Sequence, residues 1–213
     1  MRLLILSFLI TSYALAQDKP VSNPHPLDLG LDISKLLPFS QEAGVILEPF
    51  AYGTIKNDFR WRAACGFADV NFGKIYSNLN YRTKGYYVKG GVGKQFFDWF
   101  ELSLNTVYST YDEIGNVKFT GPVYGDLFIK RTQRQTLWGL ELQSDIFLQI
   151  HKHWWIDIQY RISAILSDFN DEYFSPYFAP GFGMLQIGKE KSSAKEKPNS
   201  VTAGLSIRIV YRF

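Results

Sequence analysis

VTAGLSIRIVYRF, residues 201–213, carries the clearest structural pattern in this sequence. Apolar side chains occupy every second position, at Val201, Ala203, Leu205, Ile207, Ile209, Tyr211 and Phe213. The positions between them hold Thr202, Gly204, Ser206, Arg208 and Arg212, with Val210 as the single exception. A period of two residues is typical of a β-strand with one apolar and one polar face. The stretch therefore predicts a strand that separates an apolar environment from a polar one.

The last residue of the sequence is Phe213, and Tyr211 lies two residues before it on the same face. This ending resembles the closing strand of bacterial outer-membrane β-barrels. The resemblance implies that the barrel-assembly machinery recognises Tyr211 and Phe213. It also implies an address in the outer membrane of the cell, in contact with outer-membrane lipid.

The first sixteen residues have the pattern of a secretory signal peptide. Arg2 gives a basic start, residues 3–10 form an apolar run, and residues 14–16 provide the small side chains of a cleavage site. The run is shorter than the roughly 20 apolar residues that a membrane-spanning helix needs. The chain is therefore expected to consist of a signal peptide (1–16), a flexible periplasmic leader (17–26) and a β-barrel domain (27–213).

Eight stretches alternate between apolar and polar residues and are predicted to be strands. They cover residues 27–34, 44–55, 59–67, 81–97, 100–105, 138–148, 154–163 and 201–213. Short turns are expected after the second, fourth and sixth strands. Longer loops are expected after the third, fifth and seventh, around residues 71–80, 112–131 and 170–200. An even number of strands with short and long connections in alternation predicts an all-β fold, an eight-stranded antiparallel up-and-down β-barrel of outer-membrane type.

The polar faces of these strands carry charges of both signs, interleaved with glycine and serine. In a membrane barrel the polar set faces inward, whereas in a lipocalin-like barrel the apolar set fills the interior. An eight-stranded barrel is only wide enough to hold side chains, so paired charges suit a narrow lumen. The predicted lumen charge network comprises Arg60, Arg62, Lys89, Glu101, Glu141, Asp145, Asp157, Arg161, Arg208 and Arg212.

Aromatic residues gather near the strand ends and in the last long loop. Girdles at the two membrane interfaces are expected from Trp99, Trp138, Trp154, Trp155, Tyr211 and Phe213. Within residues 173–183, a short segment expected to be exposed holds Tyr173, Phe174, Tyr177, Phe178 and Phe182. Exposed aromatics of this kind mark a partner-binding surface. The alternative is that these rings fold over the barrel mouth or join the outer girdle.

Few residues offer catalytic or metal-binding chemistry. Cys65 is the only cysteine, and its place on an apolar strand face indicates a packing role. His151 and His153 fall in a predicted turn without a nearby carboxylate or cysteine ligand, so no metal or cofactor is expected. The sequence therefore predicts no catalytic residues, and the formal net charge of +3 gives no reason to expect nucleic-acid binding.

Three stretches resemble a family of small envelope proteins of Bacteroidota whose function is unknown. They are LGLDISKLL (Leu29 to Leu37), NYRTKGYYVKGGVGKQFF (Asn80 to Phe97) and PYFAPGFG (Pro176 to Gly183). The resemblance implies a secreted β-barrel-like fold in the outer membrane. It brings no catalytic residues to this chain.

The expected function is that of a closed, non-enzymatic barrel with a structural, adhesion or partner-binding role through its outer loops. An envelope protein or a glycan is the expected partner there. Two alternatives remain open. One is an envelope enzyme that acts on lipid or glycan with the carboxylates Glu141, Asp145 or Asp157. The other is a lipocalin-like periplasmic carrier of a small apolar ligand.

Overall fold

The computed structural model describes residues 27–33, 43–56, 58–72, 80–121, 125–170, 172–174, 176–185 and 200–213. The predicted signal peptide and leader lie outside these residues. The strands are β1 (Leu27–Asp32), β2 (Ala43–Leu47), β3 (Pro49–Lys56), β4 (Phe59–Asn71), β5 (Arg82–Phe97), β6 (Phe100–Gly121), β7 (Gly125–His151), β8 (Trp154–Ile165), β9 (Phe178–Ala179), β10 (Gly183–Met184) and β11 (Val201–Arg212). Throughout these ranges, no helix has the length and apolar character that crossing a membrane requires.

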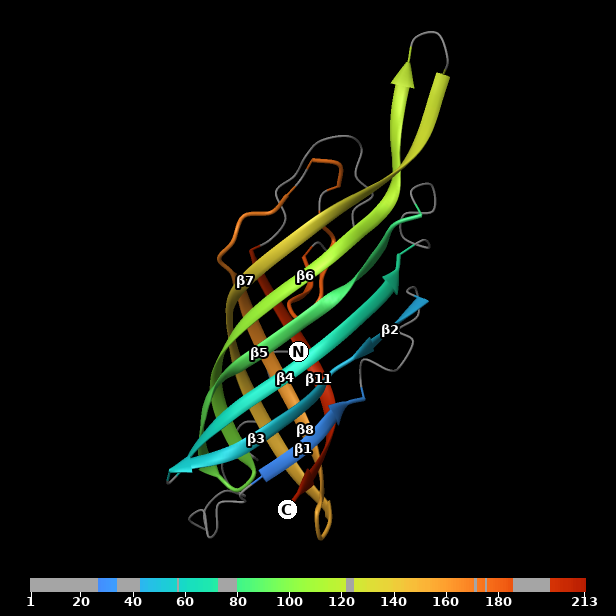
Figure 1. Ribbon diagram of the computed structural model, residues 1–213. Coiled ribbons are helices and arrows are strands. Elements are labelled where there is room, and N and C mark those ends of the chain that lie inside the picture. Colours follow the sequence, from blue (N-terminus) through green and yellow to red (C-terminus); the bar gives the residue numbers. More distant parts are fainter. Residues whose placement is uncertain are drawn as a thin grey trace, which may run out of the picture.

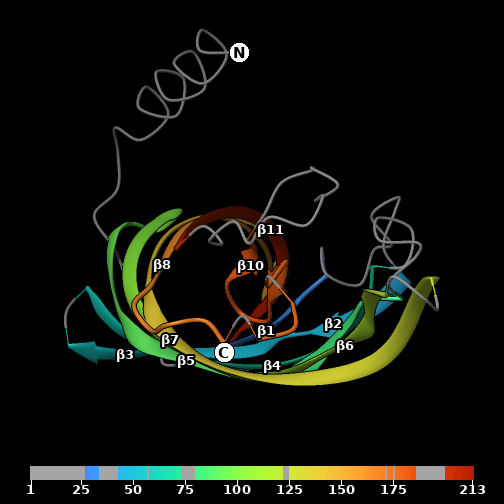
Figure 2. The ribbon, with the colours of Figure 1, turned by 90° about the horizontal axis from the view of Figure 1, so that it is seen from above.

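The long strands close into one antiparallel ring (Figures 1 and 2). From β3 to β8 each strand pairs with the next one along the chain, β8 pairs with β11, and β1 pairs with both β11 and β3 to complete the circle. β2 and β3 together form one member of the ring, because both pair with β4 in a single register. Leu47 lies opposite Phe67 and Phe50 lies opposite Ala64, with a break at Glu48 and Pro49. The predicted eight-stranded up-and-down barrel is confirmed.

The three short connections lie at one end of the barrel, which is also where Leu27 and Phe213 are held together by a backbone hydrogen bond of 3.1 Å. A shift of register precedes each connection, at Thr54/Lys56, Gln95/Phe97 and Gln149/His151. Such β-bulges bend a strand and increase its local twist, so they prepare the strands for the tight turns that follow. We call this the turn end of the barrel.

Through most of the barrel, the apolar faces of the strands point outward. Leu205 and Tyr86 are 68% and 62% exposed, whereas Glu141 and Gln159 on the polar faces are fully buried. The interior at this level is therefore polar. The apolar interior that the lipocalin-like alternative requires is wrong for this part of the barrel, because the alternation places the charged side chains inside.

Residues 112–131 do not form the predicted loop. β6 and β7 stay paired from Phe100 opposite Ile146 to Gly121 opposite Gly125, and their outer half projects beyond the ring (Figure 1). The prediction failed because the outward positions change from apolar to polar along this hairpin. The apolar–polar alternation continues, but with the opposite phase.

The change of phase divides the barrel into two levels. The outward pair Tyr108 and Trp138 is aromatic, and further along each strand the outward pair is Asp112 and Arg134. Over the same stretch, apolar side chains such as Tyr111 and Leu137 join polar ones at the inward positions, and both are buried. We call the part on the turn side of this change the charged level and the part beyond it the apolar level.

Candidate functional site: a charged lumen under a capped mouth

A network of ion pairs fills the charged level near the turn end. Arg62 of β4 is central: its guanidinium lies 3.1 Å from Glu101 and 2.5 Å from Asp145, and it donates a 2.7 Å hydrogen bond to the hydroxyl of Tyr52. Arg60 extends the network to Glu101 at 3.2 Å and to Asp28 at 2.6 Å. Further contacts join Arg208 to Asp145 and Asp157, and Arg212 to Asp28.

A second group of charges lies higher in the lumen. Glu141 of β7 accepts hydrogen bonds from Lys89 at 3.0 Å, from Arg161 at 3.4 Å and from the hydroxyl of Ser163 at 2.9 Å. Lys89 also lies 3.8 Å from Glu48, the residue between β2 and β3. Arg161 donates a further 3.0 Å bond to the carbonyl of Gly181, so this group is connected to the loop above it.

The charges in the lumen are nearly balanced. Six cations are buried in the described part of the charged level, namely Arg60, Arg62, Lys89, Arg161, Arg208 and Arg212. Seven carboxylates accompany them, namely Asp28, Asp32, Glu48, Glu101, Glu141, Asp145 and Asp157. Buried positive and negative side chains are expected in nearly equal numbers, because an uncompensated charge in a low-dielectric interior is strongly destabilising.

The lumen is tightly packed where these two groups meet. A cavity of about 10 Å³ lies between Tyr52, Arg62, Lys89 and Arg208, and Asn105 also lines it. A single water needs about 10–15 Å³ of such space. The lumen at this height therefore has room for one water rather than for a column of solvent.

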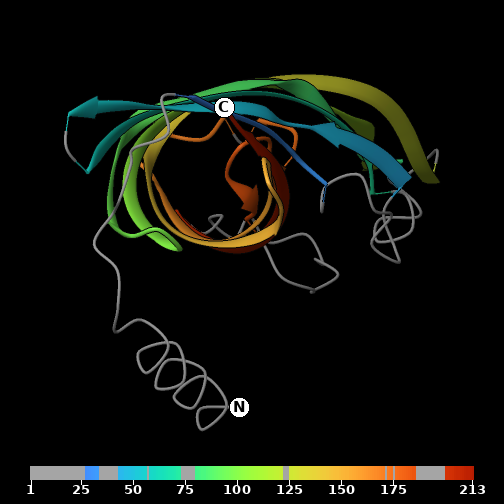
Figure 3. The same ribbon diagram turned by 90° about the horizontal axis from the view of Figure 1, so that it is seen from below.

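The segment after β8 enters the barrel and closes the mouth. Figures 2 and 3 show β10 and the chain around it inside the ring of strands. β9 and β10, of two residues each, form a short hairpin with Gly183 opposite Ala179. The turn between them contains Gly181, whose φ of +84° is a backbone conformation that side chains disfavour. We call residues 172–174 and 176–185 the plug.

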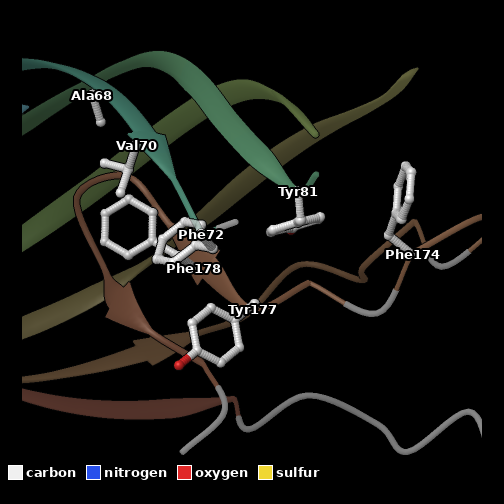
Figure 4. Packing of buried hydrophobic residues seen from close by; sticks show 7 residues of the cluster. All are labelled: Ala68, Val70, Phe72, Tyr81, Phe174, Tyr177 and Phe178. Atoms are coloured by element: carbon white, nitrogen blue, oxygen red, sulfur yellow. The ribbon is translucent and has the colours of Figure 1, made fainter. Parts of the chain in front are cut away.

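The plug is held by two apolar clusters of the apolar level. In the first, Phe174, Tyr177 and Phe178 of the plug pack with Ala68, Val70, Phe72 and Tyr81 (Figure 4). The ring of Phe72 lies 5.1 Å from that of Tyr177 and 5.7 Å from that of Phe178, centroid to centroid. In the second, Ala179, Phe182 and Leu185 pack with Val107, Tyr111, Leu137 and Ile165.

The expectation of an exposed aromatic surface does not hold for this segment. Phe174, Tyr177, Phe178 and Phe182 are buried, and only Tyr173 among these five rings is substantially exposed, at 37%. The physical reason is the change of phase in β6 and β7. It leaves an apolar inner wall at the mouth, and the rings of the plug cover that wall from water.

A buried carboxyl group anchors the plug at the outer end. The Glu113 side chain accepts hydrogen bonds from the Tyr81 hydroxyl, from Gln133 at 3.1 Å and from Gln135 at 2.7 Å. The oxygen of Gln133 accepts bonds from the backbone N–H of Tyr173 at 2.6 Å and of Phe174 at 3.2 Å. Gln133 therefore connects Glu113 to the backbone of the plug, and Gln135 connects it to the backbone of Asn170, just before the plug.

Burial raises the pKa of the Glu113 carboxyl to about 7, and the hydrogen bonds from Tyr81, Gln135 and Gln133 offset only part of that effect. Tyr81 is affected in the same direction, since burial and the neighbouring Glu113 raise the pKa of its hydroxyl. Glu113 lies beyond the apolar exterior, because its outward neighbour Asp112 pairs across the strands with Arg134.

All ten residues of the predicted charge network lie inside the barrel. Sequence reasoning did not single out Asp28, Asp32, Glu48 or Glu113 for it. Asp28 and Asp32 were on the polar face of the first strand, so their parity was a usable signal. Glu113 fell in the segment expected to be a loop, where no inward face was assigned.

The girdle prediction needs one correction. Trp138 and Trp154 are exposed on the outer wall, and Phe213 at the turn end is exposed as well. Trp155 instead faces the lumen, where the guanidinium of Arg212 lies 3.9 Å from its ring centroid. The alternation along β8 requires this, because two consecutive residues of a strand point to opposite faces.

The two turn histidines lie at the turn end. The Nδ1 of His153 is 2.9 Å from the carbonyl of Arg212, and its ring stacks on Tyr211 with a centroid distance of 5.4 Å. In the described ranges, no group of three or more His, Cys, Asp or Glu side chains is arranged to hold a metal ion.

These features define a closed antiparallel β-barrel with a charged lumen, an apolar outer wall and a plugged mouth. No family model matches the sequence, and no curated protein is similar to it. Among solved structures, the crystal structure of Neisserial surface protein A is similar to this chain. It has 14% sequence identity and a TM-score of 0.42, and the match covers 88% of this chain and 94% of that one. A similarity of this size transfers no function.

Proposed function

We propose that this protein is a non-enzymatic barrel of the outer membrane that conducts no solutes and presents its outer hairpin at the cell surface for a structural or partner-binding role. The observation that carries the proposal is the inverted polarity of the charged level. Charges are paired inside, and large apolar side chains cover the outside. In water this arrangement is unfavourable, whereas in lipid it is the expected one.

The height of the apolar wall supports a membrane-spanning position. On β7 the outward positions run from Trp138 to Leu148, which is eleven residues, and a transmembrane strand needs about 9–11. At about 3.3 Å per residue and a tilt of about 40°, this segment rises about 25 Å along the barrel axis. The apolar band of outer-membrane barrels has about the same height.

The change of phase supports an orientation. Beyond Tyr108 and Trp138 the outer wall carries Asp112, Lys130 and Arg134, which suits water rather than lipid. Outer-membrane barrels have short turns on the periplasmic side and longer connections outside. The turn end is therefore assigned to the periplasm and the β6–β7 hairpin to the exterior. In this orientation Tyr211 and Phe213 lie at the periplasmic end, where we propose that the assembly machinery binds them.

The absence of catalysis is proposed from the positions of the acids. Glu141, Asp145 and Asp157 each contact a lysine or arginine deep in the lumen, below the plug. A lipid or glycan at the mouth does not reach them. The exposed parts of the hairpin, which include Phe119, Leu127 and Phe128, remain as the surface for an envelope protein or glycan partner.

Cell fractionation and gel mobility test whether the protein is located in the outer membrane. We expect the protein in the outer-membrane fraction, with a faster band in unboiled samples than in boiled ones. In planar bilayers, the folded protein is expected to give no stepwise conductance. Recovery from the soluble periplasm without a mobility shift would contradict the address, and stable conductance steps would contradict the closed lumen.

A pair of leucine substitutions separates lipid from water at the outer wall. Leu205 lies in the apolar band and Leu127 on the hairpin, and both are exposed, at 68% and 56%. Leu205→Lys is expected to destabilise the barrel by about 2–4 kcal/mol, because a lysine near the bilayer midplane loses its hydration. Leu127→Lys is the control and is expected to change stability by less than about 0.5 kcal/mol. Equal effects would contradict a lipid environment at Leu205.

A further inference from the structure

The plug rests on a clamp made from three side chains of β6 and β7. Gln133 and Gln135 each donate an amide hydrogen bond to the same oxygen of Glu113, and each receives one or two backbone N–H bonds through its own oxygen. The N–H of Asn170 bonds Gln135 at 2.9 Å, and that of Tyr173 bonds Gln133 at 2.6 Å. Glu113 is thus connected to the plug backbone through Gln133, and to the backbone of Asn170, just before the plug, through Gln135.

The surroundings of Glu113 favour its uncharged form. The groups that face it are Thr83 and Tyr81 from the β5 side, Tyr111 on β6, Gln133 and Gln135 on β7, and the backbone of Asn170 and Phe174 from the plug side. Arg134 and Asp112 point to the outside, and Arg131 lies against the ring of Tyr173 at 5.5 Å. Among the described residues, no lysine or arginine forms an ion pair with Glu113.

The hydrogen bonds around Glu113 are compatible with a protonated carboxyl group. A neutral carboxyl has one O–H donor and keeps its acceptors. Its O–H can be donated to the Tyr81 oxygen when the tyrosine hydroxyl rotates, while the other oxygen still accepts from Gln133 and Gln135. All contacts of the clamp are then retained. An ionised carboxyl keeps the same contacts but leaves a buried charge without a neighbouring cation, which is costly.

We propose that the plug is a pH-dependent closure of the barrel mouth, seated on the Gln133–Gln135 clamp while Glu113 carries a proton and loosened when Glu113 ionises. Unseating exposes Glu113 to water, where its charge is solvated. It also opens the apolar wall formed by Val107, Tyr111, Leu137 and Ile165 to the exterior. This proposal depends on the packing of the barrel mouth and not on the location of the protein in the outer membrane. It can therefore be tested with the protein in detergent.

The sign and size of the effect follow from proton linkage. The seated carboxyl titrates with a pKa of about 7, against 4.5 for an ordinary glutamate. The seated state therefore binds the proton more tightly, and seating is strongest below pH 4.5 and weakens as the pH rises through 7. With these two values, the seating equilibrium falls by about 70-fold between pH 5 and pH 8.

A cysteine in the plug provides the measurement. Ala179 is fully buried in the second apolar cluster and is the smallest side chain there. Ala179→Cys in a Cys65→Ala background is reacted with a water-soluble methanethiosulfonate at pH 5 to 8. The rate is divided by that of Lys130→Cys on the exposed hairpin, which removes the titration of the thiol itself. The protection of the thiol at position 179 is expected to fall by about 70-fold over this range.

Two further variants decide whether Glu113 is responsible. Glu113→Gln keeps the shape without the charge, and its protection is expected to stay at the pH 5 level at every pH. Glu172→Gln, at an exposed acid of the plug, is the control and is expected to behave like the parent. The mobility shift of unboiled samples confirms that each variant has folded. Constant protection of the parent from pH 5 to 8, or an unchanged pH dependence in Glu113→Gln, would overturn the proposal.

Discussion

Removing the central arginine of the lumen tests whether charge balance stabilises this barrel. Arg62→Met takes away the guanidinium that contacts Glu101 at 3.1 Å and Asp145 at 2.5 Å, while the unbranched side chain keeps most of the volume. Both carboxylates keep one other arginine, Arg60 and Arg208 respectively. The lumen nevertheless gains one uncompensated negative charge. Breaking a buried pair in this way is expected to lower the free energy of unfolding by about 3–5 kcal/mol.

The double variant Arg62→Met/Glu101→Gln removes one charge of each sign and returns the lumen to the net charge of the parent. Each single change alters the net charge of the lumen by one unit, whereas the double change leaves that net charge unaltered. We therefore expect the double variant to lose less stability than the sum of the singles, by about 1–3 kcal/mol. Unfolding by urea in lipid vesicles, followed by tryptophan fluorescence, measures all four proteins.

The exposed pair Arg82 and Asp69 provides the matched control. Arg82 lies 2.5 Å from Asp69, but its side chain is 47% exposed. The double-mutant cycle Arg82→Met/Asp69→Asn is expected to give a coupling of less than about 1 kcal/mol, because water already solvates these charges. Additive losses for Arg62 and Glu101, within about 0.5 kcal/mol, would refute the reasoning that the lumen is stabilised as a balanced network.

Three further variants test other parts of the structure. Gly91→Ala would place a Cβ 2.2 Å from the carbonyl oxygen of Leu104, so we expect loss of the fast-migrating folded band on unboiled gels, and an unchanged band would contradict the packing of β5 against β6. Phe182→Ala removes a ring that is 1% exposed and is expected to cost about 3–5 kcal/mol of unfolding free energy in urea titrations, whereas a loss below about 1 kcal/mol would contradict its buried position. Replacing residues 115–131 by a short turn is expected to leave the mobility shift intact, because the ring closes without them, and failure to fold would contradict this.

Much of the fold followed from the alternation of side chains. All eight ring strands were predicted, because one face of each is apolar over most of its length. The charged residues of the polar faces were therefore predicted to face inward once the apolar face was assigned to the outside. For β11, the residues from Val201 to Phe213 were sufficient for this inference.

The apolar level was not predicted because the polarity of the strand faces inverts there. Asp112, Lys118 and Lys130 on outward positions made the hairpin resemble a solvated loop. Its inward positions, such as Val117 and Leu137, were not recognised as a wall that needs cover. The burial of the plug depends on that wall. A segment rich in phenylalanine and proline therefore resembled an exposed surface as long as its partner in the structure was unknown.

The site at Glu113 shows a second limit of sequence reasoning. The pKa of the Glu113 carboxyl is raised because the group is buried and the described groups around it are uncharged. Those groups come from β5, β6, β7 and the plug. Sequence spacing does not reveal such a neighbourhood, since Tyr81 and Gln133 are 52 residues apart. A glutamate on the inward face of a recognised strand would have been a sufficient reason to examine it.

The exposure of successive residues on β11 tests the central claim, that the barrel has lipid outside and charges inside. Spin labels are placed one at a time at positions 203–209 in a Cys65→Ala background, and their accessibility to dissolved oxygen is measured in lipid vesicles. High oxygen accessibility is expected at positions 203, 205, 207 and 209, and low accessibility at 204, 206 and 208. The reverse pattern, or accessibility without a period of two residues, would contradict it.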